Sequence, residues 1–271
     1  MLKKISVLGG YDKNRRSESI RRLDIHAGEV LAVAGPTGSG KTQLITDIEQ
    51  YADGETPTQR LILINDLSAD YSNPDNISRR LTAEVSQKMN FVMDSSVEGF
   101  LYRHARVRSI ENPDKIIGDV LKIANELAGE PISLEDNLTS LSGGQARALM
   151  VGDVALISNA PVVLIDEIEN AGIDRLRAME ILKGQGKIVL VVTHDPILML
   201  MADQRVIMKI GGMYRLHRTT SAEKNIMEQL VMLEKDISRL RNIVRSGESI
   251  NQQIVFKEII SYGKNFITLP A

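Results

Sequence analysis

Eight consecutive residues read GPTGSGKT and have the composition of a loop that holds phosphate groups. They fit the pattern G-x-x-x-x-G-K-[ST], and the glycines let successive backbone N–H groups turn toward phosphate oxygens. Lys41 can reach the β- and γ-phosphates of a nucleotide, and the Thr42 hydroxyl can ligate Mg²⁺. We therefore expect a nucleotide and Mg²⁺ to bind at this loop, which consists of Gly35, Pro36, Thr37, Gly38, Ser39, Gly40, Lys41 and Thr42.

Two adjacent carboxylates, Asp166 and Glu167, follow the apolar run Val162–Ile165. Asp166 is placed to hold Mg²⁺, directly or through water. Glu167 lies one residue further on, where it could polarise an attacking water molecule as a general base. Many strands end in acidic turns, so the pair alone does not indicate a catalytic site. The phosphate loop upstream is what supports a catalytic role for it.

The string LSGGQ, at Leu141–Gln145, lies between these two motifs. Its Ser-Gly-Gly part is expected to begin a helix that carries residues 146–157. Exposed N–H groups, a hydroxyl and the helix dipole together form an anion site. Lys41 already serves the nucleotide of its own chain, so we predict that Ser142 acts on the nucleotide of another subunit.

The order of these motifs resembles that of the ATP-binding cassette (ABC) ATPases. The phosphate loop is followed by a glutamine, LSGGQ, VVLIDE and a histidine after the next strand, over about residues 1–218. The resemblance implies an α/β fold, a P-loop NTPase of ABC type. It has a mainly parallel core sheet, an N-terminal antiparallel β part and a helical subdomain at about residues 94–140. It also implies hydrolysis of Mg-ATP by a head-to-tail dimer, formed with a second copy or a homologous cassette.

The resemblance assigns roles to further residues of the chain. Tyr11 resembles the aromatic residue that stacks on adenine, and Gln87 resembles the glutamine that touches Mg²⁺ and the attacking water. His194 resembles the switch histidine that contacts the γ-phosphate. The residues that would face the γ-phosphate of the partner are Ser142, Gly143, Gly144 and Gln145.

One loop departs from the family pattern. After Glu167 the family usually has Pro-Thr and a small loop that ends in aspartate, whereas this chain has Ile168–Asp174, which is one residue longer. Asp174 then takes the place of the terminal aspartate. In the family, this loop couples the two active sites of the dimer.

Three continuous apolar runs of strand length suit a parallel sheet that is buried on both faces: Val30–Ala34, Val162–Ile165 and Ile188–Val192. Each is followed by polar residues, and ligands of open parallel sheets bind at the carboxyl ends of the strands. The side chains expected to meet around one nucleotide are those of Lys41, Asp166, Glu167 and His194.

Weaker patterns predict the other elements. Strands are expected at 5–8, 19–25 and 61–65, and a helix at 43–51. Asn112 and Pro113 read as the cap and first residue of a helix. The apolar residues of that helix share one face: Ile116, Ile117, Val120, Leu121, Ala124 and Leu127.

Composition excludes several classes of site. The chain has 271 residues, a net charge of −2 and no cysteine, which rules out disulfides, thiol catalysis and cysteine-ligated metals. The near-neutral charge gives no reason to expect direct nucleic-acid binding. No apolar run approaches the roughly 18 residues of a spanning helix. We expect no signal peptide and a cytoplasmic protein, associated with a membrane only through a partner.

Residues 219–271 form an extension beyond the cassette. Thr220 and Glu223 read as a capping box, and Gly247 as a helix stop. Between them runs a heptad seam, Ile226, Leu230, Leu233, Ile237, Leu240 and Val244. The sequence leaves open whether this helix dimerises or packs on its own cassette.

Two biological roles fit an ATPase of this kind. The first is the ATP-binding subunit of a transporter whose membrane-spanning subunits are separate chains. The alternative is a soluble, non-transport ABC ATPase that remodels or activates a cytoplasmic partner. Of the two, we expect the transporter role.

Overall fold

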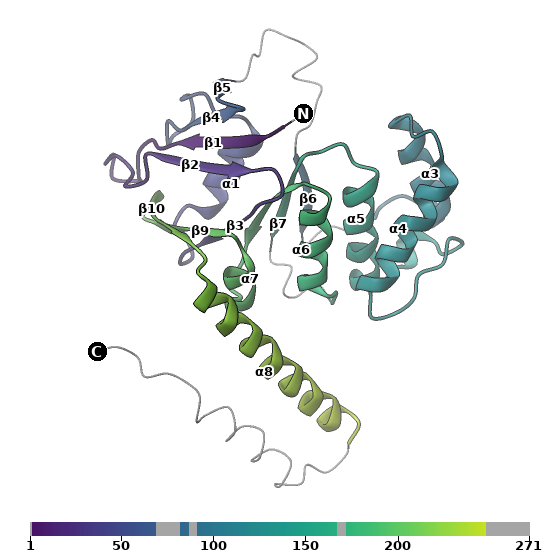
Figure 1. Ribbon diagram of the computed structural model, residues 1–271. Helices are drawn as coiled ribbons and strands as arrows, with labels where there is room; N and C mark the ends of the chain where they lie inside the picture. Colours follow the sequence, from purple (N-terminus) through teal and green to yellow (C-terminus); the bar gives the residue numbers. More distant parts are fainter. Residues whose placement is uncertain (1, 69–81, 87–90, 167–171, 248–271) are drawn as a thin grey trace. The chain divides into compact units, whose positions relative to one another are not determined.

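The computed structural model describes residues 2–68, 82–86, 91–166 and 172–247 (Figure 1). It divides into two compact units, Met1–Ser221 and Ala222–Ala271. The strands among these residues all belong to the first unit.

A six-stranded sheet forms the centre of the first unit, in the order β10-β9-β3-β8-β7-β6 (Figure 1). Strands β6, β7, β8, β3 and β9 run parallel, and β10 pairs antiparallel with β9. The strands are β3 (Val30–Ala34), β6 (Thr82–Ser86), β7 (Val162–Asp166), β8 (Ile188–Val192), β9 (Gln204–Lys209) and β10 (Gly212–Arg218).

Alternate residues of the central strands enter two different cores, which explains why these strands are apolar throughout. Val163 and Val189 belong to the core on one face, whereas Val162 and Ile188 belong to the core on the other. Burial on both faces is the arrangement that the continuous apolar runs predicted.

An antiparallel sheet and one helix cover the second of these faces. The sheet has the order β2-β1-β4-β5, with β1 (Lys4–Leu8), β2 (Arg22–His26), β4 (Leu61–Ile64) and β5 (Leu67–Ser68). Helix α1 (Lys41–Glu49) contributes Leu44 and Ile48 to the same core. The predicted N-terminal antiparallel β part is therefore confirmed. Its second strand begins at Arg22 rather than at residue 19, because Ser17 and Glu18 fold back on the loop at Tyr11.

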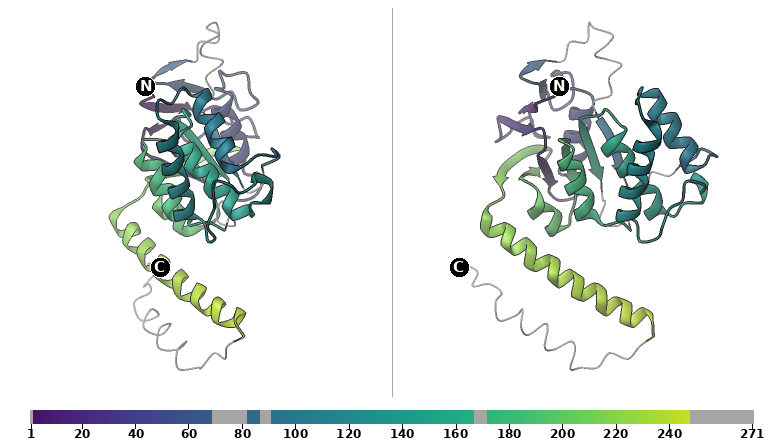
Figure 2. Two further views of the ribbon diagram at one scale, coloured as in Figure 1. Left: turned by 90° about the vertical axis from the view of Figure 1, so that its right-hand side faces the viewer. Right: turned by 45° about the vertical axis from the view of Figure 1, so that its right-hand side comes forward.

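Helices line the other face of the six-stranded sheet. They are α3 (Val97–Val107), α4 (Pro113–Leu127), α5 (Gly143–Leu156), α6 (Arg175–Gly184) and α7 (Pro196–Met201), with a 3₁₀ helix at Leu138–Ser140. Figures 1 and 2 show α3 and α4 beside α5, on the side of the sheet away from β10. Asn112 caps α4 by accepting a hydrogen bond from the N–H of Lys115, and Pro113 is its first residue, as predicted.

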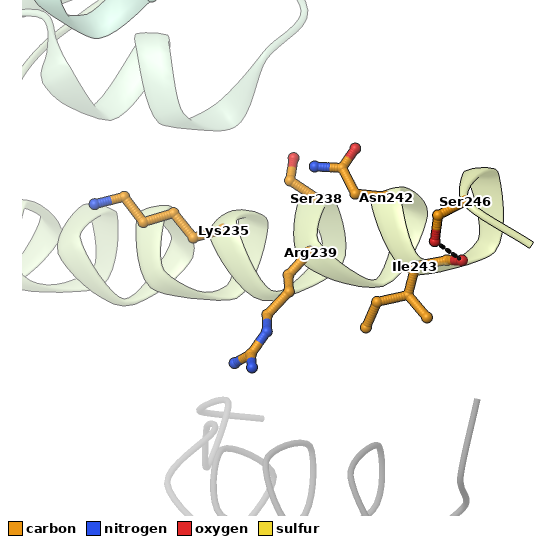
Figure 3. A pocket seen from close by; sticks show the side chains of 6 residues that line it. All are labelled: Lys235, Ser238, Arg239, Asn242, Ile243 and Ser246. Carbon is orange, nitrogen blue, oxygen red and sulfur yellow. Dashed lines mark hydrogen bonds between the residues drawn. The ribbon is translucent and has the colours of Figure 1, made fainter. Parts of the chain in front are cut away.

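The second unit contains α8, which runs from Ser221 to Arg245 and includes the predicted heptad seam. The helix ends before Gly247, which has the left-handed φ of +77° expected of a helix stop. Figure 3 shows Lys235, Ser238 and Asn242 projecting from one side of α8, along a surface hollow of about 540 Å³. None of the 25 residues of α8 is buried.

No helix within the described ranges is long and apolar enough to cross a membrane.

Candidate functional site

The phosphate loop joins β3 to α1, and its backbone conformation requires glycine. Gly35, Gly38 and Gly40 have φ values of +147°, +76° and +100°. A Cβ on Gly35 would lie 2.5 Å from the carbonyl oxygen of Met208, and a Cβ on Gly40 would lie 2.7 Å from Cα of Gly211. Neither separation is possible for real atoms, so a side chain at either position would force the loop out of its place.

The start of α1 is suited to an anion. Gly40 is the N-cap, and as a glycine it has no side chain to accept hydrogen bonds from the first N–H groups of the helix. The hydroxyl of Ser39 is buried and has no hydrogen-bond partner in the part of the chain that the structure describes. The ammonium group of Lys41 donates to the carbonyl oxygens of Gly35 and Pro36, at 2.7 and 3.2 Å. These donors fit the phosphate chain of a nucleotide.

The register of the sheet brings the other polar positions to the same edge. Val192 of β8 pairs with Val33 of β3 on one side and with Asp166 of β7 on the other, and Asp166 in turn pairs with Ser86 of β6. In the sequence, the phosphate loop follows β3 and His194 follows β8. Glu167 follows Asp166 at the end of β7, and Gln87 follows β6. Gln87 and Glu167 themselves lie outside the described residues.

Thr42 and Asp166 line one cavity of about 150 Å³ between α1 and strands β6, β7 and β8. No group of three or more His, Asp or Glu side chains that could hold a metal ion was found among the residues the structure describes. Mg²⁺ does not need such a group, because it keeps several waters and binds one or two protein oxygens together with substrate phosphates. The pair therefore fits Mg²⁺ that arrives with a nucleotide.

Two further carboxylates, Glu49 and Glu84, line the same cavity. Burial raises the pKa of Glu49, and the negative charge of Glu84 raises it further. Sequence reasoning did not single out this pair, because Glu84 lies in a strand that the sequence did not predict. Glu49 therefore keeps its proton to a higher pH than an ordinary glutamate does.

The turn that carries His194 is held from both sides. Thr193 accepts a hydrogen bond from the N–H of Asp195 at 2.9 Å, and Asp195 caps α7 by accepting from the N–H of Ile197 at 2.8 Å. The guanidinium of Arg175 also forms an ion pair with Asp195, at 2.6 Å. These contacts fix the backbone on both sides of an exposed His194.

The LSGGQ segment begins helix α5, as predicted. The N–H of Gln145 donates to the hydroxyl of Ser142 at 3.3 Å, and the N–H of Ser142 donates to Oε1 of Gln145 at 2.9 Å, which completes a capping box. The amide of Gln145 also donates to the carbonyl of Pro131 at 2.8 Å. The side chain of Gln145 therefore stabilises the backbone conformation of the LSGGQ segment, whereas Ser142 is exposed to solvent.

Asp174 has a structural partner on each side. Its side chain caps α6 by accepting from the N–H of Arg177 at 3.0 Å, and its own N–H donates to the carbonyl of Leu127 at 3.0 Å. Gly172, two residues earlier, lies beside the start of α5, since a Cβ there would be 3.7 Å from Cα of Gly144. The end of the loop that departs from the family pattern thus lies next to LSGGQ.

Tyr11 lies in a closed loop of residues 9–18 and is 39% exposed. The loop is bound to the phosphate loop directly, because the ammonium group of Lys13 donates to the carbonyl of Gly38 at 2.8 Å. The structure therefore brings together the phosphate loop, the Tyr11 loop and the carboxyl ends of β6, β7 and β8.

A family model and the related sequences all indicate the same protein family. A family model described as ABC transporter matches residues 20–170. An uncharacterised ABC transporter ATP-binding protein of Methanocaldococcus jannaschii is 47% identical over 252 residues, which are 93% of this chain and 96% of the relative. The macrolide export ATP-binding/permease protein MacB of Campylobacter jejuni is 27% identical over 240 residues, which are 81% of this chain but only 35% of that relative.

Solved structures show the same fold. CbiO1 of Clostridium perfringens, described as part of the ABC transporter complex cbiONQ, has a TM-score of 0.60 at 22% identity, and the match covers 90% of this chain and all of that one. A dimeric ATP-binding cassette with bound ADP and Pi has a TM-score of 0.56 at 20% identity, over 80% of this chain and 99% of the other. Taken with the family model and the archaeal relative, these matches show that the chain belongs to the ABC transporter family, as an ATP-binding cassette that hydrolyses ATP.

Proposed function

We propose that the chain binds Mg-ATP at the phosphate loop and hydrolyses it with Glu167 as the general base. The observation that supports this is the register of β3, β8, β7 and β6, whose carboxyl ends lie at one edge of the sheet. In the sequence, the phosphate loop, His194, Glu167 and Gln87 each follow one of these ends. Thr42 and Asp166 would hold Mg²⁺, which neutralises charge on the phosphates. Tyr11 would stack on adenine and His194 would contact the γ-phosphate.

We propose further that two chains close head to tail on two ATP molecules. In this arrangement the exposed Ser142 and the N–H groups at the start of α5 face the γ-phosphate that the other subunit holds. Asp174 and the preceding loop belong to the same interface, because Gly172 lies beside Gly144. Hydrolysis removes the shared γ-phosphate and reopens the dimer.

The partner that we propose for the dimer is a separate membrane-spanning subunit. Several apolar side chains are exposed on the helical part of the cassette, close in sequence to Gln87. Val92 is 96% exposed, and Met93, Tyr102 and Val107 are also exposed. Scattered exposed apolar residues are ordinary, but exposed apolar residues that follow the proposed catalytic glutamine in the sequence would suit a docking site that responds to nucleotide.

A fractionation experiment in the native host tests this role. The double variant Val92→Glu and Tyr102→Ala should leave the membrane fraction while the purified protein keeps its ATP hydrolysis. Leu67→Glu is the matched control, because Leu67 is an exposed apolar residue of β5 on the antiparallel sheet. Wild-type protein found only in the soluble fraction would refute the transporter role.

A further inference from the structure

Three charged side chains, Glu18, Asp47 and Arg60, are fully buried behind the Tyr11 loop; we call them the buried ion cluster. We propose that this cluster and the β9–β10 turn at Ile210–Gly211 position Tyr11 relative to the phosphate loop, and so set the affinity of the site for the adenine base. The inference rests on the proposed stacking of Tyr11 on adenine. Each residue acts through Tyr11, as a positioning residue.

Arg60 is the centre of the buried ion cluster. Its guanidinium donates to Oε1 and Oε2 of Glu18 at 2.6 and 3.2 Å, and to Oδ2 of Asp47 at 2.8 Å. It also donates to the carbonyl oxygen of Gly211 at 3.0 Å. The planar guanidinium holds its donors in a fixed fork, so these partners cannot move independently of one another.

Each partner of Arg60 belongs to a different wall of the nucleotide site. Glu18 closes the Tyr11 loop by accepting from the N–H of Gly10 at 2.9 Å, and it also accepts from the N–H of Met213 in β10 at 2.6 Å. Asp47 lies in α1, the helix that begins at the phosphate loop. Arg60 therefore ties the adenine side of the site to the phosphate side.

The β9–β10 turn lies between the same two loops. The N–H of Gly211 donates to the carbonyl of Ser39 in the phosphate loop at 2.8 Å, and the carbonyl of Ile210 accepts from the N–H of Lys13 in the Tyr11 loop at 2.9 Å. Contact is so close that a Cβ on Gly211 would lie 2.6 Å from Cγ of Lys13. The turn thus sets the spacing between the two loops.

Stability alone is a poor reason for such a cluster. Burying two carboxylates and one guanidinium costs desolvation energy, and well-packed apolar residues often stabilise a core equally well. A charged cluster fixes geometry, however, because a small displacement breaks several hydrogen bonds at once. The geometry fixed here is that of the phosphate loop and of the loop that carries Tyr11.

The test compares ATP with inorganic tripolyphosphate, which has the phosphates but no base. Gly211→Ala adds the Cβ that collides with Lys13, and Glu18→Gln keeps the size of Glu18 but replaces one of the two carboxylate oxygens that accept hydrogen bonds from Arg60. Either variant should weaken ATP binding about fivefold, close to the loss from Tyr11→Ala, because stacking is what is lost. Tripolyphosphate affinity should stay within twofold of wild type.

Coupling to Tyr11 separates positioning from general damage. In a Tyr11→Ala background, Gly211→Ala should cause no further loss of ATP affinity. The matched control is Lys209→Met on the same hairpin, where Lys209 lies over the ring of Tyr214; it should leave both affinities unchanged. Thermal unfolding checks that each variant is folded, and Glu18→Gln keeps the test open should Gly211→Ala fail to fold.

Two results would overturn the inference, and they differ from failure of the proposed function. Equal weakening of ATP and tripolyphosphate would show that the turn supports only the phosphate loop, and additive losses with Tyr11→Ala would show that it acts elsewhere. If Tyr11→Ala itself leaves ATP affinity unchanged, the stacking role of Tyr11 fails, and the inference fails with it.

Discussion

Ser142 has two functions in the proposed dimer, and the substitution Ser142→Asp separates them. The first function is structural, since the hydroxyl accepts a hydrogen bond from the N–H of Gln145 and so caps α5. Aspartate caps helices about as well as serine, so the free energy of unfolding should change by less than about 0.5 kcal/mol. The second function is to face the γ-phosphate held by another subunit, which a carboxylate would repel.

The size of this repulsion follows from the position of the cap. A carboxylate at the start of α5 would lie about 4 Å from an anionic oxygen bound there, which costs about 4 kcal/mol at the effective dielectric constant of a protein surface. A cost of about 4 kcal/mol at one site alone would weaken the dimer about a thousandfold. Each dimer contains two such sites, so the variant should be monomeric at micromolar concentration.

Light scattering after size-exclusion chromatography in Mg-ATP measures this directly. The Glu167→Gln background slows hydrolysis, so the wild-type interface should give a dimer and Ser142→Asp a monomer. The matched control is Ser96→Asp, because Ser96 caps α3 in the same way, by accepting from the N–H of Gly99 at 3.1 Å. A Ser142→Asp dimer as stable as that of the control would refute the assignment of LSGGQ to the γ-phosphate of the partner.

Three more outcomes follow from the site and from α8. Glu167→Gln alone should keep ATP binding but lower turnover about a hundredfold or more, and near wild-type hydrolysis would remove Glu167 as the base. Glu49→Gln should raise the free energy of unfolding at neutral pH. Burial and the charge of Glu84 raise the pKa of Glu49, so the free energy of unfolding of the wild type falls as the pH rises from the ordinary glutamate range through this raised pKa. Urea titrations at a pH below the ordinary glutamate range should therefore show no gain in stability for Glu49→Gln. The chain has no cysteine, so Leu233→Cys should form a disulfide-linked dimer on mild oxidation if α8 pairs in parallel through its seam. Lys235→Cys, from the side of α8 drawn in Figure 3, is its control, and equal cross-linking of the two variants would exclude the seam.

The central strands could be predicted from sequence because each is buried on both faces. Val30–Ala34 and Ile188–Val192 coincide with β3 and β8, since a short continuous apolar run is typical of a strand in the middle of a parallel sheet. The helix after the phosphate loop was predicted at 43–51 and occupies Lys41–Glu49. The prediction ran too far because Tyr51 has a left-handed φ of +50°, which apolar spacing does not reveal.

Other strands gave weaker signals. Strand β6 has the sequence TAEVS, and only Val85 is buried, so neither a continuous run nor an alternation marks it. Strand β9 does alternate, with Val206 and Met208 buried, and that signal could have been used. Among the residues that the structure describes, β6 is the last strand of the six-stranded sheet, so it has one edge without a neighbouring strand and its residues are less constrained.

The buried ion cluster could not be predicted from spacing at all. Glu18 and Arg60 are 42 residues apart, and each alone reads as a surface charge. They meet because the Tyr11 loop packs against the segment that leads into β4, where the N–H of Tyr11 donates to the carbonyl oxygen of Thr58 at 2.8 Å. The motifs, by contrast, were readable because glycine, lysine and paired carboxylates in that order are typical of a nucleotide site.

The central claim is that each active site is built from two chains, and mixing two inactive variants tests it most directly. Lys41→Ala disables the phosphate loop, and Ser142→Asp disables the segment that serves the partner. In a heterodimer of the two, both lesions fall in one composite site and the other site is intact. A shared site predicts that the mixture hydrolyses ATP faster than either variant alone. A mixture no more active than its parts, under conditions where heterodimers are shown to form, would contradict the shared site.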